Sequence, residues 1–287
     1  MLITSLLYGK SKGTRAQDFL NNRAPIRSIP GHLNGMISRH ISGDHIYLEC
    51  GSGKPLIFCH GLFGGIFNID KAASALSKNY RFIMPYLPMY DLPLKECRVK
   101  MLGQYLADFV DQLQLDEAVF IGNSMGGGAA SYYASTPDNK VKGLVLCGSS
   151  GLTNIPLSNG YFKRKNYDFV RSATQNIFFN RNIPNEEMTK DVFKALQHTE
   201  LVIRSIRFTK SAINEKMHHE LSLIQSPSLL IWGRQDPITP AEAAPQFQQL
   251  IQDSELVILE ECGHVPAQEK PEEFLLHLNS FLKKINH

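Results

Sequence analysis

The feature that most constrains the fold is a strand-like run that ends in a glycine-flanked serine. Residues 119–122 are apolar up to Gly122, and Gly126 opens a glycine- and alanine-rich segment typical of a helix start. Between them, Ser124 is the centre of a Gly-x-Ser-x-Gly motif, which predicts a sharp strand-to-helix turn that lifts the serine hydroxyl clear of the backbone. Glycines are needed on both sides because the turn is packed too tightly for a Cβ at either position. The N-terminus of the following helix offers free N–H groups to an oxyanion. Taken alone, the motif also fits a turn that merely packs a helix on a strand.

The composition is that of an ordinary globular chain. Its 287 residues are 43% apolar and 20% charged, enough to bury a core without a metal or disulfide. The 30 Lys and Arg residues against 27 Asp and Glu give a net charge of +3, too small to indicate nucleic acid or a membrane surface as partner. No run reaches membrane-spanning length. We expect no cofactor and no metal, and the sequence leaves the oligomeric state open.

The cysteines bear on the cellular compartment. There are five of them, none in a Cys-x-x-Cys pair, and Cys50, Cys59 and Cys147 fall in strand-like runs where a reduced thiol is a small buried hydrophobe. The apolar start of the chain lacks a basic region and a small-residue cleavage site, which argues against a signal peptide. These features predict a reducing, cytoplasmic location.

Strand-like apolar runs alternate with helical segments along most of the chain. This alternation predicts βαβ units, and hence an α/β fold with a mostly parallel, doubly wound sheet. A hairpin turn should join the first two strands. The expected strands are 36–41, 45–50, 56–59, 82–84, 118–124 with the serine turn, 144–147, 228–232 and 255–259. The expected helices are 68–80, 100–115, the segment from the serine turn to 135, 241–251 and 271–285.

The alternation is interrupted once, which suggests the domain organisation. Residues 152–217 show only helical patterns, clearest at 185–197 and 199–212. They carry eleven Lys and Arg against six Asp and Glu. We therefore expect an N-terminal extension at 1–35, a core formed by 36–151 and 218–287, and an inserted helical cap at 152–217. The cap's positive charge is either an ordinary solvated surface or an attraction for an anionic substrate.

Two further polar residues follow strand-like runs. Asp236 comes after 229–232, and His264 after 255–259. Ligands of an open α/β sheet bind beyond the carboxyl ends of its strands, so both side chains should lie at the same edge as Ser124. A serine hydroxyl needs a base, and the base needs an orienting carboxylate. Taken singly, Asp236 could be only a turn former and His264 only a loop histidine. The catalytic interpretation is favoured because Ser124, Asp236 and His264 each follow the end of a different predicted strand.

An oxyanion formed at Ser124 needs two donors. One is the backbone N–H of Met125, which follows the serine. The other should come from the loop after the 56–59 strand, with the N–H of Leu62 as first choice and that of Phe63 as second. We expect His60 to fix this loop by a hydrogen bond rather than to act as a base or a metal ligand.

With these pieces in place, the chain resembles the α/β-hydrolase fold family. The resemblance covers about residues 36–285, with 152–217 where the family has its cap. It is carried by five matching segments: His-Gly-Leu-Phe-Gly at 60–64, Gly-Asn-Ser-Met-Gly-Gly at 122–127, Trp-Gly-Arg-Gln-Asp-Pro at 232–237, Cys-Gly-His-Val-Pro at 262–266, and Glu-Lys-Pro-Glu-Glu-Phe at 269–274. It implies Ser124 as nucleophile, His264 as base and Asp236 as orienting acid. A serine at this turn is unlike haloalkane dehalogenases and epoxide hydrolases, which have aspartate there.

Within the family, the motifs favour an esterase. The Gly-Asn-Ser-Met-Gly-Gly run is similar to that of meta-cleavage-product hydrolases, which split carbon–carbon bonds. Those enzymes usually have Trp where this chain has Val265, and a more Gly- and Pro-rich oxyanion loop. The His-Gly-Leu-Phe-Gly loop is more similar to that of small carboxylesterases.

The pocket around the nucleophile should be apolar. Its expected lining comprises Leu62, Phe63, Phe67, Met125 and Val265. Phe178 and Phe179 of the cap are candidates to roof it or simply to pack helices. The main hypothesis is a hydrolase of small carboxylic esters or related acyl compounds. The alternatives are a carbon–carbon hydrolase of an acidic dienone, a lactonase or perhydrolase, and a non-enzymatic ligand-binding member of the fold.

Overall fold

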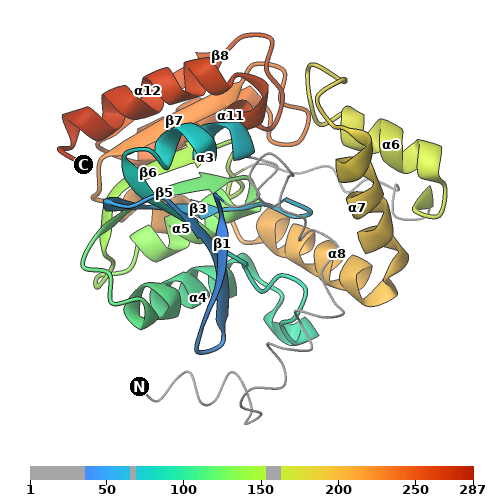
Figure 1. Ribbon diagram of the computed structural model, residues 1–287, viewed down its shortest axis with the longest axis horizontal. Helices are drawn as coiled ribbons and strands as arrows, with labels where there is room; N and C mark the ends of the chain where they lie inside the picture. The colour runs from blue at the N-terminus through green and yellow to red at the C-terminus, as the bar shows by residue number, and fades with distance from the viewer. Residues whose placement is uncertain (1–35, 65–68, 153–162) are drawn as a thin grey trace.

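Eight strands form one sheet, built from the apolar runs of the sequence (Figure 1). The structure is a computed structural model that describes residues 36–64, 69–152 and 163–287. The expected extension at 1–35 and the pocket residue Phe67 lie outside these ranges. The spatial order is β1-β2-β4-β3-β5-β6-β7-β8. The strands are β1 (Ser38–Ser42), β2 (His45–Cys50), β3 (Lys54–Cys59), β4 (Tyr80–Pro85), β5 (Ala118–Asn123), β6 (Val141–Cys147), β7 (Ser228–Gly233) and β8 (Ser254–Leu259).

The sheet is mostly parallel, as predicted. Only β1 with β2 and β2 with β4 pair antiparallel, the former as the expected hairpin. Every pair from β4 to β8 is parallel. Strand β5 is buried throughout its length, which explains its unbroken apolar sequence. Its side chains alternate between two cores, with Phe120 in one and Val119 and Ile121 in the other.

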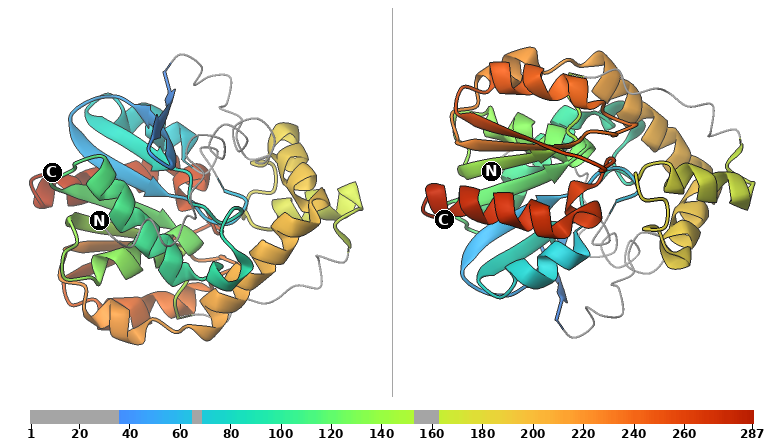
Figure 2. Two further views of the ribbon diagram at one scale, coloured as in Figure 1. Left: turned by 90° about the horizontal axis from the view of Figure 1, so that it is seen from below. Right: turned by 90° about the horizontal axis from the view of Figure 1, so that it is seen from above.

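Helices cover both faces of the sheet. The first core holds residues of α4 (Val99–Gln112), α5 (Met125–Ala134), α9 (His218–Ser222) and α10 (Ala244–Leu250), and the second those of α3 (Asp70–Leu76), α11 (Pro266–Glu269) and α12 (Pro271–Lys284). The two opposite views bring the green α4 and the red α12 to the front in turn (Figure 2). This is the doubly wound arrangement expected from the sequence.

Some predicted helix bounds were wrong. The helix expected at 68–80 ends at Leu76, because the chain turns there and Tyr80 already belongs to β4. The helix expected at 241–251 is divided into a 3₁₀ turn, η5 (Ala241–Ala243), and α10. Another 3₁₀ turn, η3 (Leu94–Glu96), follows the proline-rich loop after β4.

Among the residues that the structure describes, three longer helices lie between β6 and β7 in the sequence, and we call them the helical block. They are α6 (Tyr167–Gln175), α7 (Glu186–Gln197) and α8 (Thr199–Asn214). Asparagines cap two of them: Asn166 accepts from the Phe169 N–H and Asn185 from the Met188 N–H. Figure 1 shows the block, yellow to orange, to one side of the sheet. None of the helices in the described ranges combines the length and apolar character that crossing a membrane requires.

A buried histidine joins the hairpin to α4. His45 is 7% exposed, and its ring lies 4.6 Å from that of Tyr105 and 5.5 Å from that of Phe109. Burial lowers the pKa of His45 to about 4. Its Nδ1 has no hydrogen-bond partner in the described ranges. The fold therefore holds this imidazole in its neutral form.

We expect His45→Phe to make stability less sensitive to acid. The folded pKa of about 4 lies below the unfolded value of 6.5, so only the unfolded chain gains this proton as the pH first falls. The wild type should lose about 3 kcal/mol of unfolding free energy through His45 between pH 6.5 and pH 4. Urea unfolding at several pH values measures the slope, with His40→Gln, at an exposed strand position, as control. Equal slopes for wild type and His45→Phe would contradict this account.

Candidate active site

Ser124 occupies the turn between β5 and α5. Its φ is +55° and its ψ is −120°, a backbone conformation that non-glycine residues rarely adopt. The surrounding main chain holds it in place: the Ser124 N–H donates to the Cys147 carbonyl (2.9 Å), and the Ser124 carbonyl accepts from the Ser150 N–H (3.0 Å). Strain of this kind persists only where neighbours fix it, and it is often found at functional sites.

The glycines around Ser124 are required by close backbone approach. A Cβ on Gly126 would lie 2.0 Å from the Cys59 carbonyl oxygen, and one on Gly122 would lie 2.5 Å from the Gly127 Cα. On the other side, a Cβ on Gly61 would lie 3.1 Å from the Ser124 Cβ. The loop after β3 is therefore packed directly against the serine.

We expect Gly126→Ala to cost about 3 kcal/mol or more of unfolding free energy, since a backbone clash at 2.0 Å forces the β3 end or the turn to move. Chemical denaturation measures the loss. Gly128→Ala is the matched control, because its Cβ would first meet the side chains of Ser150 and Val99, which can shift. Equal losses in the two variants would show that the turn does not depend on this contact.

Asp236 and His264 meet where β7 and β8 end. The His264 Nδ1 lies 2.8 Å from the Asp236 Oδ2, and the two residues are 6% and 5% exposed. The other carboxylate oxygen, Oδ1, accepts from the N–H groups of Ile238 (2.8 Å) and Thr239 (2.9 Å). The main-chain N–H groups thus bind Oδ1, while Oδ2 faces the imidazole.

Thr239 is a member of this cluster that the sequence reasoning missed. Its fully buried hydroxyl lies 2.9 Å from the Asp236 Oδ2, 2.8 Å from the Gly148 carbonyl oxygen and 3.3 Å from the His264 Nδ1. The Trp232 Nε1–H donates to the Thr239 carbonyl and fixes the turn (2.9 Å). A threonine three residues after an aspartate in a turn was the available signal.

The side-chain amide of Asn123 links the serine turn to residues 260–265, the loop that carries His264, which we call the histidine loop. The Asn123 Nδ2 donates to the carbonyls of Cys147 (3.0 Å) and His264 (3.1 Å). Asn123 directly precedes Ser124, so the serine and the histidine are held at the same edge of the sheet. The structure thus pairs Asp236 directly with His264 and places Ser124 at the same sheet edge, while no hydrogen bond between the Ser124 hydroxyl and the His264 ring is found in the described ranges.

The loop at 60–64 is fixed as expected through His60. The Nδ1–H of this buried residue donates to the Gly61 carbonyl (2.9 Å), and its Nε2 accepts from the Leu87 N–H (3.2 Å). Acceptance at Nε2 requires a neutral ring, and burial, which lowers the pKa of His60, favours that form. His60 therefore shapes the loop that lies on Ser124.

The two candidate donors of this loop differ in their bonding. The Phe63 N–H donates to the Tyr90 hydroxyl (2.8 Å), with Phe63 at a φ of +53°. For the Leu62 N–H, no acceptor is found within the described ranges. The Met125 N–H is the first of α5 and has no intrahelical acceptor. The bonding therefore favours Leu62 over Phe63 as the second donor.

The side chains next to these groups are apolar. Met125 and Val265 are 3% and 4% exposed, while Leu62 and Phe63 are partly buried. Of the two phenylalanines considered for the roof, Phe178 is buried and Phe179 is 47% exposed. Their segment reaches the histidine loop, since the His264 N–H donates to the Ile177 carbonyl (3.0 Å).

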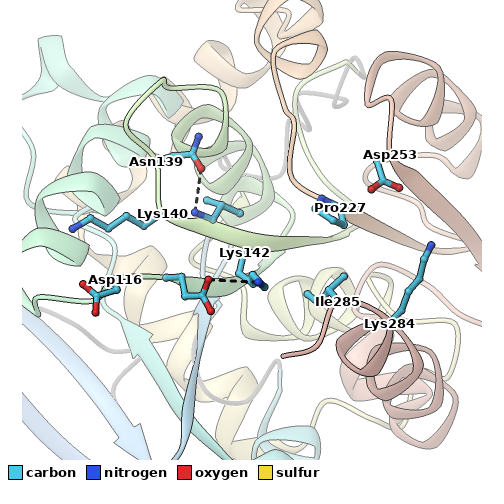
Figure 3. A pocket seen from close by; sticks show the side chains of 10 residues that line it. Asp116, Asn139, Lys140, Lys142, Pro227, Asp253, Lys284 and Ile285 are labelled. Atoms are coloured by element: carbon cyan, nitrogen blue, oxygen red, sulfur yellow. Dashed lines mark hydrogen bonds and ion pairs between the residues drawn. The ribbon is translucent and has the colours of Figure 1, made fainter.

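Two cavities of the described surface lie elsewhere. One, of about 590 Å³, lies at the amino ends of the parallel strands, which is the sheet edge opposite Ser124. Charged residues line it, among them Asp116, Lys142 and, from α12, Lys284 (Figure 3). Its Lys142 is already paired with Glu117 (3.6 Å). The other, of about 580 Å³, lies between η3 and α8. Neither is lined by Ser124, Asp236 or His264.

Comparisons with known proteins agree with the fold of this chain. A family model described as alpha/beta hydrolase fold matches residues 54–271. An uncharacterized hydrolase, YugF of Bacillus subtilis, is 27% identical over 85% of this chain and 96% of its own length. The 2-hydroxy-6-oxo-6-(2'-aminophenyl)hexa-2,4-dienoic acid hydrolase of Metapseudomonas resinovorans is 28% identical, covering 83% and 87%. The crystal structure of an alpha/beta hydrolase enzyme from the sediment metagenome of the Mar Chica lagoon, Morocco, is 29% identical, with a TM-score of 0.71 over 87% of this chain and 100% of that one.

Proposed function

The chain belongs to the α/β hydrolase fold family, and from this premise we propose that it is a serine hydrolase that cleaves a small carboxylic ester through an acyl-enzyme. The observation that carries the proposal is the buried 2.8 Å hydrogen bond between His264 and Asp236, at the sheet edge where Ser124 is held in its strained turn. Ser124 is the nucleophile, His264 the base and Asp236 the orienting acid.

The reaction proceeds in two half-reactions. The His264 Nε2 accepts the proton of the Ser124 hydroxyl while its oxygen attacks the acyl carbon, and the N–H groups of Met125 and Leu62 stabilise the oxyanion. As the ester C–O bond breaks, the imidazolium returns the proton to the leaving alcohol. Water then gives a proton to His264 as its oxygen attacks the acyl carbon. When the bond between that carbon and the Ser124 oxygen breaks, the imidazolium returns the proton to the serine, which releases the carboxylic acid and restores Ser124.

A neutral acyl group suits the residues beside the nucleophile. The side chains of Leu62, Phe63, Met125 and Val265 are apolar, so an apolar acyl chain would gain free energy by leaving water to pack against them. We propose that the helical block, within 152–217, forms a cap over this site on a core of 36–151 and 218–287. All five cysteines are buried and unpaired, which supports our expectation of a reducing, cytoplasmic setting.

A second candidate is a carbon–carbon hydrolase acting on an acidic dienone. The observation in its favour is that several relatives are dienoate hydrolases, including the Metapseudomonas enzyme and a 2-hydroxy-6-oxo-2,4-heptadienoate hydrolase of Pseudomonas putida, 24% identical over 82% of this chain and 91% of its own length. Such a substrate carries a carboxylate that needs a cationic partner. The four uncharged residues above favour the ester.

A substrate screen distinguishes these readings. Purified wild type and Ser124→Ala are assayed with 4-nitrophenyl esters from acetyl to octanoyl and with a coloured 2-hydroxy-6-oxo-dienoate. We expect ester turnover in the wild type alone. Rapid loss of the dienoate without ester turnover would replace the ester by the carbon–carbon reading. Thermal stabilisation by such ligands with no turnover would favour a binding protein.

A further inference from the structure

Glu269 contacts both the histidine loop and the segment that follows α6. Its Oε1 accepts from the N–H groups of Gly263 (2.9 Å) and Val265 (3.4 Å), the two residues that flank His264. Its Oε2 accepts from the Phe179 N–H (2.8 Å). One carboxylate, at the end of the short α11, therefore joins two segments that are distant in sequence.

The same two segments meet directly at a second point. The His264 N–H donates to the Ile177 carbonyl (3.0 Å), and a Cβ on Gly263 would lie 2.6 Å from that oxygen. All three consecutive N–H groups of 263–265 thus donate either to Glu269 or to the segment after α6. We call the contacts of Glu269 and Ile177 with this loop the latch.

The carboxylate is held by main-chain groups rather than by a cation. Burial raises the pKa of Glu269, while hydrogen bonds from the N–H groups of Gly263, Phe179, Val265 and Asn180 oppose that shift. The neighbouring Lys270 lies closer to other carboxylates, those of Glu261 (3.7 Å) and Glu273 (3.8 Å). Within the described residues, no ion pair of Glu269 is found. A half-buried carboxylate that accepts from three main-chain N–H groups, and has no ion pair among the described residues, is suited to holding backbone segments in place.

We propose that Glu269 is a positioning residue: its carboxylate couples the segment after α6 to the histidine loop and thereby sets the position of His264. This inference rests on the proposed function, because it assigns a role in the same site. When segment 177–179 is docked, the latch occupies every N–H of 263–265, and the imidazole is held against Asp236. When the segment undocks, those N–H groups lose their acceptors and the loop is free to move.

Glutamine at this position is a sharp test of the latch. A glutamine amide has nearly the shape of the carboxylate but only one acceptor oxygen, and its NH₂ group would face N–H donors. Glu269→Gln can therefore satisfy the histidine loop or the segment after α6, but not both. Phe179→Pro provides an independent variant, since it removes the N–H that Oε2 accepts and leaves Glu269 unchanged.

The experiment compares wild type, Glu269→Gln, Phe179→Pro and, as matched control, Glu272→Gln at an exposed position on α12. It measures kcat and KM on the best ester, the rate of Ser124 labelling by a fluorophosphonate, and amide hydrogen exchange of 177–180 and 263–265. In the first two variants, we expect kcat and labelling rate to fall by about 10- to 100-fold with KM little changed, since a displaced base slows the step that uses it. Exchange should become faster in both segments together. Glu272→Gln should match the wild type.

Two results would overturn the latch: folded Glu269→Gln with wild-type kcat, or faster exchange in one segment only. A structural role alone would lower the unfolding midpoint without changing kcat per folded molecule. If the wild type itself shows neither turnover nor labelling, the proposed function fails, and the exchange measurement still decides whether Glu269 couples the two segments.

Discussion

Replacing Ser124 by alanine should reduce ester turnover by about 10⁴- to 10⁶-fold, to the level left by binding and the oxyanion donors alone. The variant keeps the strained turn, because its main-chain bonds to Cys147 and Ser150 do not involve the hydroxyl. What disappears is the only nucleophile in the turn, and with it the covalent intermediate. Steady-state rates on the best ester, with active sites counted in the wild type, measure the loss.

Ser131→Ala is the matched control for this result. Ser131 lies in the same helix, α5, is fully buried, and its hydroxyl has no hydrogen-bond partner in the described ranges. Its loss should leave kcat unchanged and barely alter stability. Residual activity in Ser124→Ala within tenfold of the wild type would assign the chemistry to another residue.

Asp236→Asn should lower kcat by about 10⁴-fold while leaving the fold intact. The expected loss of rate follows from the different bonding of the two carboxylate oxygens. Because Oδ1 accepts from the N–H groups of Ile238 and Thr239, the new amide must keep its oxygen there and turn its NH₂ toward His264. A donor at that position requires His264 to accept at Nδ1 and to carry its proton on Nε2. That tautomer cannot take the proton of Ser124.

The pH profile makes this prediction specific. Part of the lost rate should return at high pH, where hydroxide removes the serine proton in place of the imidazole. Asp253→Asn, at an exposed position just before β8, is the matched control and should behave as the wild type. An Asp236→Asn variant with normal kcat, or with a loss explained by unfolding, would remove Asp236 from the orienting role.

The fold could be predicted because its determinants are local in sequence. Unbroken apolar runs such as 119–122 are what a strand buried on both faces requires, and the turn at Ser124 has glycines where the backbone approaches most closely. The meeting of Asp236 with His264 follows from a general rule about strand ends. These parts needed no knowledge of distant contacts.

The parts that sequence reasoning missed depend on tertiary contacts. Glu269 and Thr239 act through main-chain N–H and carbonyl groups of other segments, and residue types do not reveal such partners. Helix α3 ends before the predicted bound because Tyr80 already pairs in the sheet as the first residue of β4. Local apolar periodicity does not predict such a pairing. Likewise, the preference for Leu62 over Phe63 as the proposed second donor comes from a tertiary contact, the hydrogen bond from the Phe63 N–H to the Tyr90 hydroxyl.

The most direct test of the account is the intact mass of the protein after treatment with a fluorophosphonate, for wild type and for Ser124→Ala. We expect one covalent adduct on the wild type and none on the variant, because only a serine with an aligned base attacks this reagent rapidly. An unmodified but folded wild type, or an adduct that persists in Ser124→Ala, would contradict the claim that Ser124 is the activated nucleophile.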